Sequence, residues 1–196
     1  VLEELLGVTG SPFPEHQRRR RELFEAGRFD EARQLWTPAD RAELIAIKKL
    51  CEGASSRETV LACGRIILYF WASSLMSAAF NRVLDQRIDA GTVNRLLEGD
   101  VAWKHDNRAV FAVTADELTT GELDQRLARF EVSPTGPLWG EGMPRAGGAV
   151  DEVEREALAA TAVSMDNLAT SRYRPDGGRR PFRQPVRNAD LEGGSD

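Results

Sequence analysis

The chain has 196 residues, 41% hydrophobic and 29% charged, so it can bury the core of a globular domain. A net charge of -5 argues against a uniformly basic nucleic-acid binder, and two cysteines are too few for a disulfide framework or a cysteine-based zinc site. No apolar run reaches the roughly 18 residues that cross a bilayer and no secretory leader opens the chain, so we expect a cytoplasmic protein without a membrane partner.

The first part of the chain predicts a helix that begins near Ser11 and Pro12 and ends at Gly27, because these residue types are typical of helix starts and ends. The four arginines from Arg18 to Arg21 fan out over most of the helix circumference and cannot form one basic face. Acidic residues four positions away favour a surface of ion pairs instead.

Further helices are predicted up to residue 88. Short helices are expected over residues 30–36 and from Thr37 to about Leu50, and another starts at Ser56 and runs toward Ile67. It leads into the stretch Leu68 to Ile88, whose apolar residues recur every three or four positions, as on the buried face of a helix.

The second half predicts a small sheet. Residues 100–104 and 109–114 alternate in polarity on either side of a turn-forming cluster, which favours a β-hairpin. The other expected elements are a helix at 121–129, a third strand at 130–133, a long loop at 133–148, a helix at 151–160 and an edge strand at 179–187. The fold class is therefore α+β, with a helical N-terminal half packed with a small, mainly antiparallel sheet.

The sequence contains no constellation typical of metal, cofactor or acyl-transfer chemistry. Its only histidines are His16 and His105, and HExxH, EF-hand, phosphate-loop and GxSxG patterns are absent. We therefore expect no metal and no cofactor.

Two segments are candidates for binding. Residues 103–107, WKHDN, are either a self-capping hairpin tip or an RNA or domain interface, because tryptophan can stack and lysine can reach a phosphate. Residues 172–187 carry six arginines against one acid, with Tyr173 and Phe182 among them. This composition is typical of RNA-binding segments, in which arginines neutralise phosphates and aromatic rings stack on bases. A solvent-exposed edge strand is an equally good alternative interpretation.

Taken in order, several segments resemble the TruD family of tRNA pseudouridine synthases. SSLMSAAFNRVLDQRI at 73–88 resembles a family helix with the core QSALFN, although Met76 and Ala79 stand where that core has Gln and Leu. GDVAWKHDNRAVFAV at 99–113, FEVSPTGPLWG at 130–140 and GGRRPFRQPV at 177–186 resemble a hairpin, a loop and a late GxRRPL segment of the family. PEHQRRRRELFEAGRF at 14–29 resembles the helical portion of bacterial members.

The resemblance implies the family's inserted domain. Residues 1–53 would be a helical segment that leads into this domain, 54–178 its core, and 179–196 a strand that returns toward a catalytic domain. The family isomerises uridine to pseudouridine, typically at tRNA position 13, without a metal or organic cofactor. Its nucleophilic aspartate lies in a GxKDxxA-like motif that these residues do not contain, so Asp106 is not assigned a catalytic role and the chain alone is expected to be inactive.

The resemblance also implies partners: tRNA and the catalytic domain of the same parent protein. The expected phosphate contacts come from a set of basic residues, namely Lys104, Arg108, Arg172, Arg174, Arg179, Arg180 and Arg183. The alternative is a freestanding, non-catalytic RNA-binding or interaction module.

Overall fold

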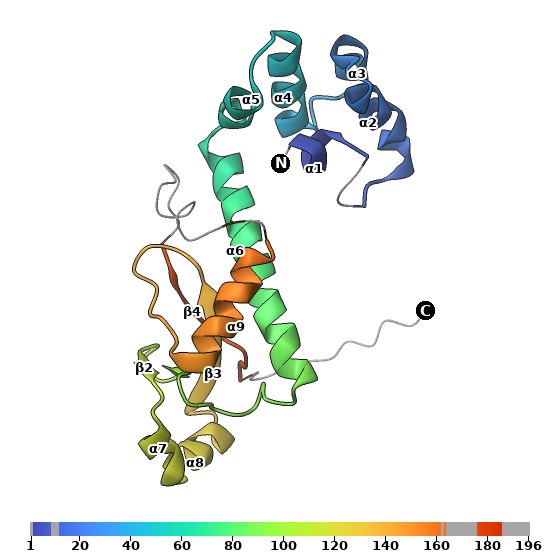
Figure 1. Ribbon diagram of the computed structural model, residues 1–196. Coiled ribbons are helices and arrows are strands. Elements are labelled where there is room, and N and C mark those ends of the chain that lie inside the picture. Colours follow the sequence, from blue (N-terminus) through green and yellow to red (C-terminus); the bar gives the residue numbers. More distant parts are fainter. Residues whose placement is uncertain (1, 9–11, 162, 164–175, 186–196) are drawn as a thin grey trace. The chain divides into compact units, whose positions relative to one another are not determined.

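The computed structural model describes residues 2–8, 12–161, 163 and 176–185, which form two compact units, 1–71 and 72–196 (Figure 1). The expected boundaries at 53/54 and 178/179 stay predictions. Among the described residues no single helix is long and apolar enough to cross a membrane. One pair, α5 (Ser56–Ala62) and α6 (Arg65–Asp89), which is bent by 106° at its junction, meets the length and composition criteria when taken together.

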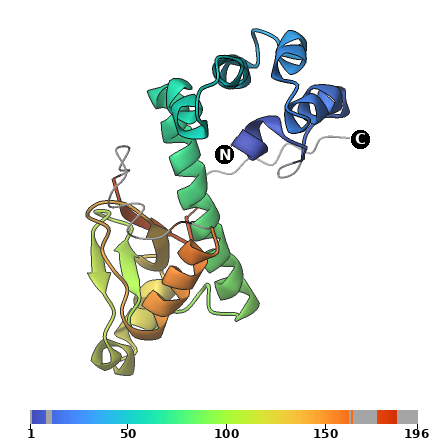
Figure 2. The ribbon, with the colours of Figure 1, turned by 45° about the horizontal axis from the view of Figure 1, so that its top comes forward.

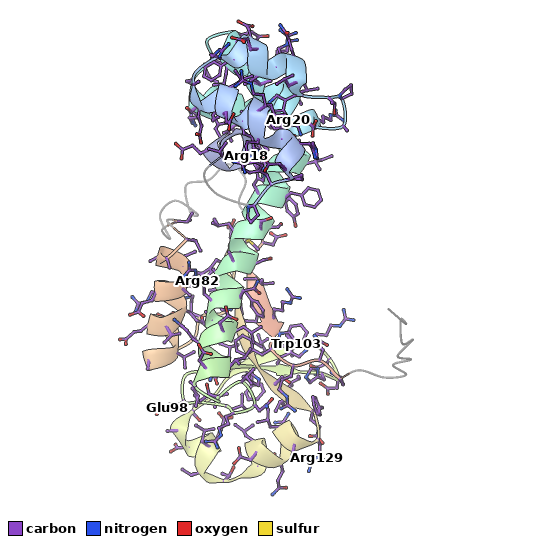
Figure 3. All side chains as sticks on the ribbon, turned by 90° about the vertical axis from the view of Figure 1, so that its right-hand side faces the viewer. Arg18, Arg20, Arg82, Glu98, Trp103 and Arg129 are labelled. Carbon is purple, nitrogen blue, oxygen red and sulfur yellow. The ribbon has the colours of Figure 1, made fainter. Side chains whose placement is uncertain are left out.

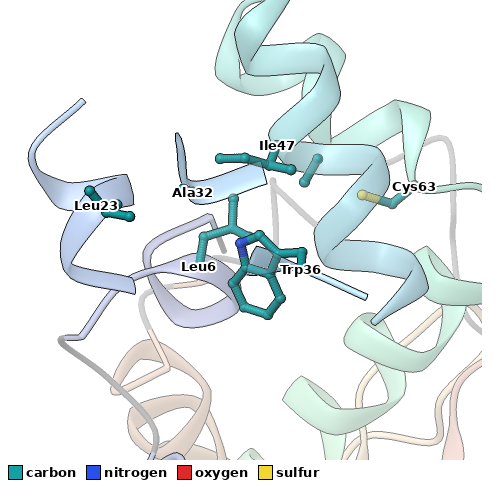
Figure 4. Packing of buried hydrophobic residues seen from close by; sticks show 7 residues of the cluster. Leu6, Leu23, Ala32, Trp36, Ile47 and Cys63 are labelled. Atoms are coloured by element: carbon teal, nitrogen blue, oxygen red, sulfur yellow. The ribbon is translucent and has the colours of Figure 1, made fainter. Parts of the chain in front are cut away.

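Unit 1 is helical. Its elements are α1 (Leu2–Leu6), a 3-10 turn η1 (Glu15–Gln17), α2 (Arg18–Glu25), α3 (Phe29–Leu35), α4 (Arg41–Cys51), α5 (Ser56–Ala62) and the first part of α6 (Arg65–Asp89). Figure 4 shows its buried core, whose largest side chain is Trp36, packed with Leu6, Leu23 and Ile47. The predicted helix end is confirmed, since α2 stops just before Gly27, whose φ of 70° is left-handed.

Two expectations for unit 1 are wrong in detail. The helix expected from Ser56 toward Ile67 breaks after Ala62, because Gly64 adopts a left-handed φ of 93° before α6 begins. The arginine run is only partly an ion-paired surface: Arg20 and Arg21 are buried. Arg20 pairs with Asp40 at 3.0 Å and lies 3.9 Å from the Trp36 ring centre.

Unit 2 contains the sheet. After α6 come β1 (Val101–Lys104), β2 (Val110–Ala112), α7 (Ala115–Thr119), α8 (Glu122–Ala128), β3 (Val132–Leu138), α9 (Gly148–Ala159) and β4 (Gly178–Pro181). The described strands pair antiparallel in the order β2-β1-β3-β4, which confirms the hairpin and the edge position of β4. The α+β fold class is confirmed.

Helices cover both faces of this sheet. Ala102 and Val132 point to one face and pack with Leu123 and Leu127 of α8. Val101 points to the other face and packs with Val150 of α9. Figures 1 and 2 both show α9 alongside α6, where Ala79 and Leu158 share a cluster.

The long loop expected from residue 133 is wrong, because β3 continues to Leu138 and is a central, buried strand. Pro134 cannot donate a ladder bond, yet its carbonyl accepts one from Phe182 N at 3.0 Å. At Gly136 a Cβ would lie 2.6 Å from the Phe182 ring and 2.8 Å from the Phe80 ring. The glycine therefore makes room for two aromatic rings that rest on the strand, and local sequence alone did not reveal this.

Candidate nucleic-acid interface

The β1–β2 turn presents the first part of the candidate site. Lys104 N donates to Ala109 O at 2.8 Å and Arg108 N donates to Lys104 O at 2.9 Å, which closes the turn. The carboxylate of Asp106 accepts from Asn107 N, and the side-chain oxygen of Asn107 accepts from Ala109 N. The self-capping interpretation is thus confirmed for Asp106 and Asn107, although the left-handed residue is Arg108, with φ 63°.

A groove of about 940 Å³ opens beside this turn, where β1 ends, β3 begins and the chain leaves β4. Residues from three sequence segments line it: Trp103, His105, Asp106, Arg108, Arg126, Arg129, Phe130, Glu131, Gln184 and Pro185. Figure 3 shows Trp103 of β1 and Arg129, just after α8, on the same side of unit 2. The groove therefore combines aromatic rings with cations from elements far apart in the sequence.

His105 forms part of the groove wall and is held in place. Its backbone N donates to Glu131 O at 3.0 Å, and its Nε2 lies 2.8 Å from Ser133 Oγ. Burial, and then the positive charge of Arg183, lower the pKa of His105 below its ordinary value of 6.5. The imidazole is therefore mostly neutral at pH 7, and it offers a ring with one donor and one acceptor nitrogen.

The end of α8 supplies paired charges. Glu131 lies 2.6 Å from Arg129 Nε and 3.6 Å from Arg126 Nε. The hydrogen bond from Arg129 lowers the pKa of Glu131, so this carboxylate stays ionised. The three side chains form a cluster with one net positive charge on the groove rim.

Phe130 lies between these arginines and the chain after β4. It is 40% exposed, and its φ of 55° is left-handed. The Arg183 guanidinium lies 4.0 Å from the centre of its ring, which is close enough for a cation–π contact, and Arg183 Nη1 donates to Leu127 O at 3.3 Å. This contact positions Arg183 next to the groove.

The structure brings together part of the expected basic set. Arg108 lines the groove, Arg183 packs on Phe130 next to it, and Lys104 is the last residue of β1, with Nζ 5.4 Å from the Phe111 ring centre. Arg180 is exposed on β4, and its guanidinium lies 5.2 Å from the Phe80 ring centre. Two further members of the set, Arg172 and Arg174, lie outside the described residues.

Arg179 departs from the expected role as a phosphate contact. Its side chain and that of Glu154 are both 0% exposed, and the two form a two-point ion pair at 2.6 and 2.8 Å. Its Nε donates to Thr135 Oγ1 at 2.9 Å and its Nη2 to Thr135 O at 3.0 Å. The guanidinium is enclosed by these partners, so we assign Arg179 to the structural core.

The turn residues of the groove were predicted from the sequence, whereas Arg126, Arg129 and Phe130 were not. The available signal was RxxRF directly before a predicted strand, a pattern that puts two cations on the last turns of a helix next to an aromatic residue. Among the described residues no three His, Cys, Asp or Glu side chains converge where a metal ion could bind.

Proteins of one family match this chain along almost its whole length. The profile of the family described as tRNA pseudouridine synthase D (TruD) matches residues 1–196. The chain is 30% identical over 194 residues to tRNA pseudouridine synthase D of Geotalea daltonii, covering 98% of this chain and 47% of that protein. It is 31% identical over 199 aligned positions to the enzyme of Geobacter metallireducens, covering 98% and 48%.

A solved structure has a similar fold. The crystal structure described as tRNA pseudouridine synthase D (TruD) of Methanosarcina mazei superimposes with a TM-score of 0.76 at 20% identity, over 92% of this chain and 44% of that one. The chain thus spans about half the length of the curated relatives it matches. Since the profile matches the whole sequence, the chain belongs to the tRNA pseudouridine synthase D (TruD) family.

Proposed function

We propose that this chain is the RNA-facing lobe of a tRNA pseudouridine synthase, which converts uridine to pseudouridine, typically at tRNA position 13. The reacting aspartate is supplied by a part of the parent protein that these 196 residues do not contain, so the chain alone is inactive. Its partners are tRNA and that catalytic domain. An enzyme of this kind acts in the cytoplasm, without a metal or cofactor.

The groove is the observation that supports an RNA contact most directly. Arg108 is exposed on the turn, and within the described part of the chain its side chain makes no salt bridge or hydrogen bond. Lys104, Arg180 and Arg183 each have a cation–π contact to a ring, and none of the described carboxylates pairs with them. Cations that are not neutralised by the protein remain able to replace the counterions of RNA phosphates.

This arrangement reconciles RNA binding with the acidic net charge. Three of the seven described exposed arginines of unit 1 are each paired with a nearby glutamate: Arg18 with Glu15, Arg19 with Glu22 and Arg28 with Glu31. In unit 2, four cations without a described carboxylate partner lie on the strands and at the groove: Lys104, Arg108, Arg180 and Arg183. A local positive field suffices for contact with a polyanion, because screening limits each charge to a range of about 10 Å.

Charge reversal tests the proposal. A variant with Lys104, Arg108, Arg180 and Arg183 all replaced by Glu should bind a tRNA transcript roughly 100-fold more weakly at about 50 mM salt. Its plot of log affinity against log salt should be flatter by up to about four units, roughly one for each phosphate that the variant no longer neutralises. Filter binding over a salt series measures both quantities.

A control with half that change in net charge reverses two exposed arginines of unit 1, Arg41 and Arg57, which lie in the first turns of α4 and α5, where glutamate is compatible with the helix. This control should keep most of the wild-type affinity. Equal affinity and slope in the wild type and the four-residue variant, at unchanged circular dichroism, would contradict the proposal.

A further inference from the structure

Both described non-glycine residues with a left-handed backbone, Arg108 and Phe130, line the same groove. This conformation is uncommon for residues with a Cβ and costs on the order of 1–3 kcal/mol. The two come from separate elements, the β1–β2 turn and the link between α8 and β3. Such outliers concentrate at binding sites, where the strain aims a side chain, so their coincidence here points to a ligand.

The groove offers flat surfaces for such a ligand. The Phe130 ring remains 40% exposed although Arg183 covers part of it. Trp103 of β1 is half-buried and lines the same groove, and the neutral imidazole of His105 lies two residues further along. Aromatic rings of this kind bind nucleobases by stacking, whatever the base.

Polar groups surround these rings. Asp106 and Glu131 are acceptors, Arg108 is a donor with a full charge, and the Gln184 amide can donate and accept. The cavity of about 940 Å³ falls within the range of pockets that enclose small organic molecules, roughly 300–1,000 Å³. A heterocycle with a phosphate fits this combination of rings, mixed polar groups and the unpaired cation of Arg108.

We propose that the groove holds one unpaired nucleotide of the bound tRNA, with its base stacked on Phe130 against the Trp103 side and its phosphate on Arg108. The inference rests on the proposed function and adds which part of the RNA enters this site. A double helix hides the faces of its bases. The carboxylate of Asp106, with which no described cation pairs, also disfavours a continuous run of phosphates at the turn, so the geometry selects an unstacked nucleotide.

The test measures tRNA affinity of the full 196-residue chain with the rings changed and the charges kept. Phe130→Leu and Trp103→Leu should each weaken binding about tenfold, since base stacking on an aromatic side chain has an effect of this order. For Trp103→Leu the slope against salt should not change, because every cation is kept and no described cation packs on the Trp103 ring. Phe130→Tyr keeps an aromatic face and should restore near wild-type affinity.

Two controls isolate the effect. Tyr69→Leu removes an aromatic ring that is 62% exposed in unit 1 and should not alter affinity. Competition with a short oligouridylate, an RNA duplex of the same length and uridine 5′-monophosphate separates the sources of the nucleotide. The single strand should displace tRNA at a lower concentration than the duplex or the monophosphate.

The outcomes separate the two claims. If the wild type binds tRNA in the salt-dependent manner described but both leucine variants bind equally well, the nucleotide site is wrong while the proposed function stands. Better competition by the duplex or by the free monophosphate also overturns the inference. If the wild type does not retain tRNA at low salt, the proposed function fails, and this inference fails with it.

Discussion

Replacing Arg179 by leucine should lower the free energy of unfolding by about 3–5 kcal/mol, because it leaves the Glu154 carboxylate buried without its partner. Both side chains are 0% exposed, and the pair joins β4 to α9. The substitution also removes the donors to Thr135 Oγ1 and to its carbonyl. Urea unfolding followed by circular dichroism measures the decrease.

The same variant should show a characteristic pH dependence. Burial raises the pKa of Glu154 above its ordinary value of 4.5, and Arg179 opposes that rise. Without Arg179 the folded-state pKa rises further above the unfolded value, so the folded variant binds the extra proton. Stability is then retained below about pH 4.5 and lost as pH rises through the folded-state pKa. The difference in the free energy of unfolding between Arg179→Leu and the wild type should therefore be smaller at pH 5 than at pH 8.

Two controls check this account. Arg180→Leu changes the neighbouring residue of the same strand, which is exposed, and should cost less than about 1 kcal/mol. The double variant Arg179→Leu with Glu154→Leu removes both charges and should regain much of the stability that Arg179→Leu loses. Equal stability of the Arg179 and Arg180 single variants would contradict the structural assignment of Arg179.

Replacing Asp100 by alanine should destabilise unit 2 by a similar amount, about 3–5 kcal/mol. Asp100 is 0% exposed, its Oδ1 accepts from Arg87 Nη2, and its Oδ2 accepts from Leu97 N at 2.7 Å. Removing it leaves the Arg87 guanidinium without its charged partner. Arg87 is only 7% exposed, and its Nη1 already has no hydrogen-bond partner among the described residues. Thermal unfolding of the variant gives the magnitude.

Asp106→Ala is the matched control, since Asp106 is exposed and its described hydrogen bond is local to the turn. It should cost less than about 1 kcal/mol. The loss of stability in Asp100→Asn should lie between those of Asp100→Ala and Asp106→Ala, because the amide keeps an acceptor for Leu97 N but loses the charge opposite Arg87. If Asp100→Ala is no less stable than Asp106→Ala, the buried pair does not hold α6 to the start of β1.

The sequence predicted elements whose signals are local. The hairpin, the end of α2 at Gly27 and the edge strand β4 depend on turn residues, a glycine and prolines, and all were confirmed. The short helix α7 was missed although its capping box, Thr114 with Glu117, is a local signal. The extent of β3 was not predictable in this way, since its Pro134 and Gly136 are tolerated only because of neighbours distant in sequence.

The candidate site was predictable in part for the same reason. The turn residues were found because they are adjacent in sequence, whereas Arg126 and Phe130 join them only through the pairing of β1 with β3. Strand alternation was an unused signal: Arg179 and Arg180 are neighbours in β4 and must point to opposite faces, so both could not contact one RNA surface. Which of the two is buried depends on Glu154, which α9 supplies from outside that segment.

Ultraviolet cross-linking of the chain to a tRNA transcript, followed by mass spectrometry of the cross-linked peptides, tests most directly whether unit 2 contacts tRNA through the groove beside the β1–β2 turn. We predict cross-links within residues 103–108, 126–131 and 180–185, and their disappearance when Lys104, Arg108, Arg180 and Arg183 are all replaced by Glu. Cross-links confined to unit 1, or unchanged by that replacement, would contradict the claim.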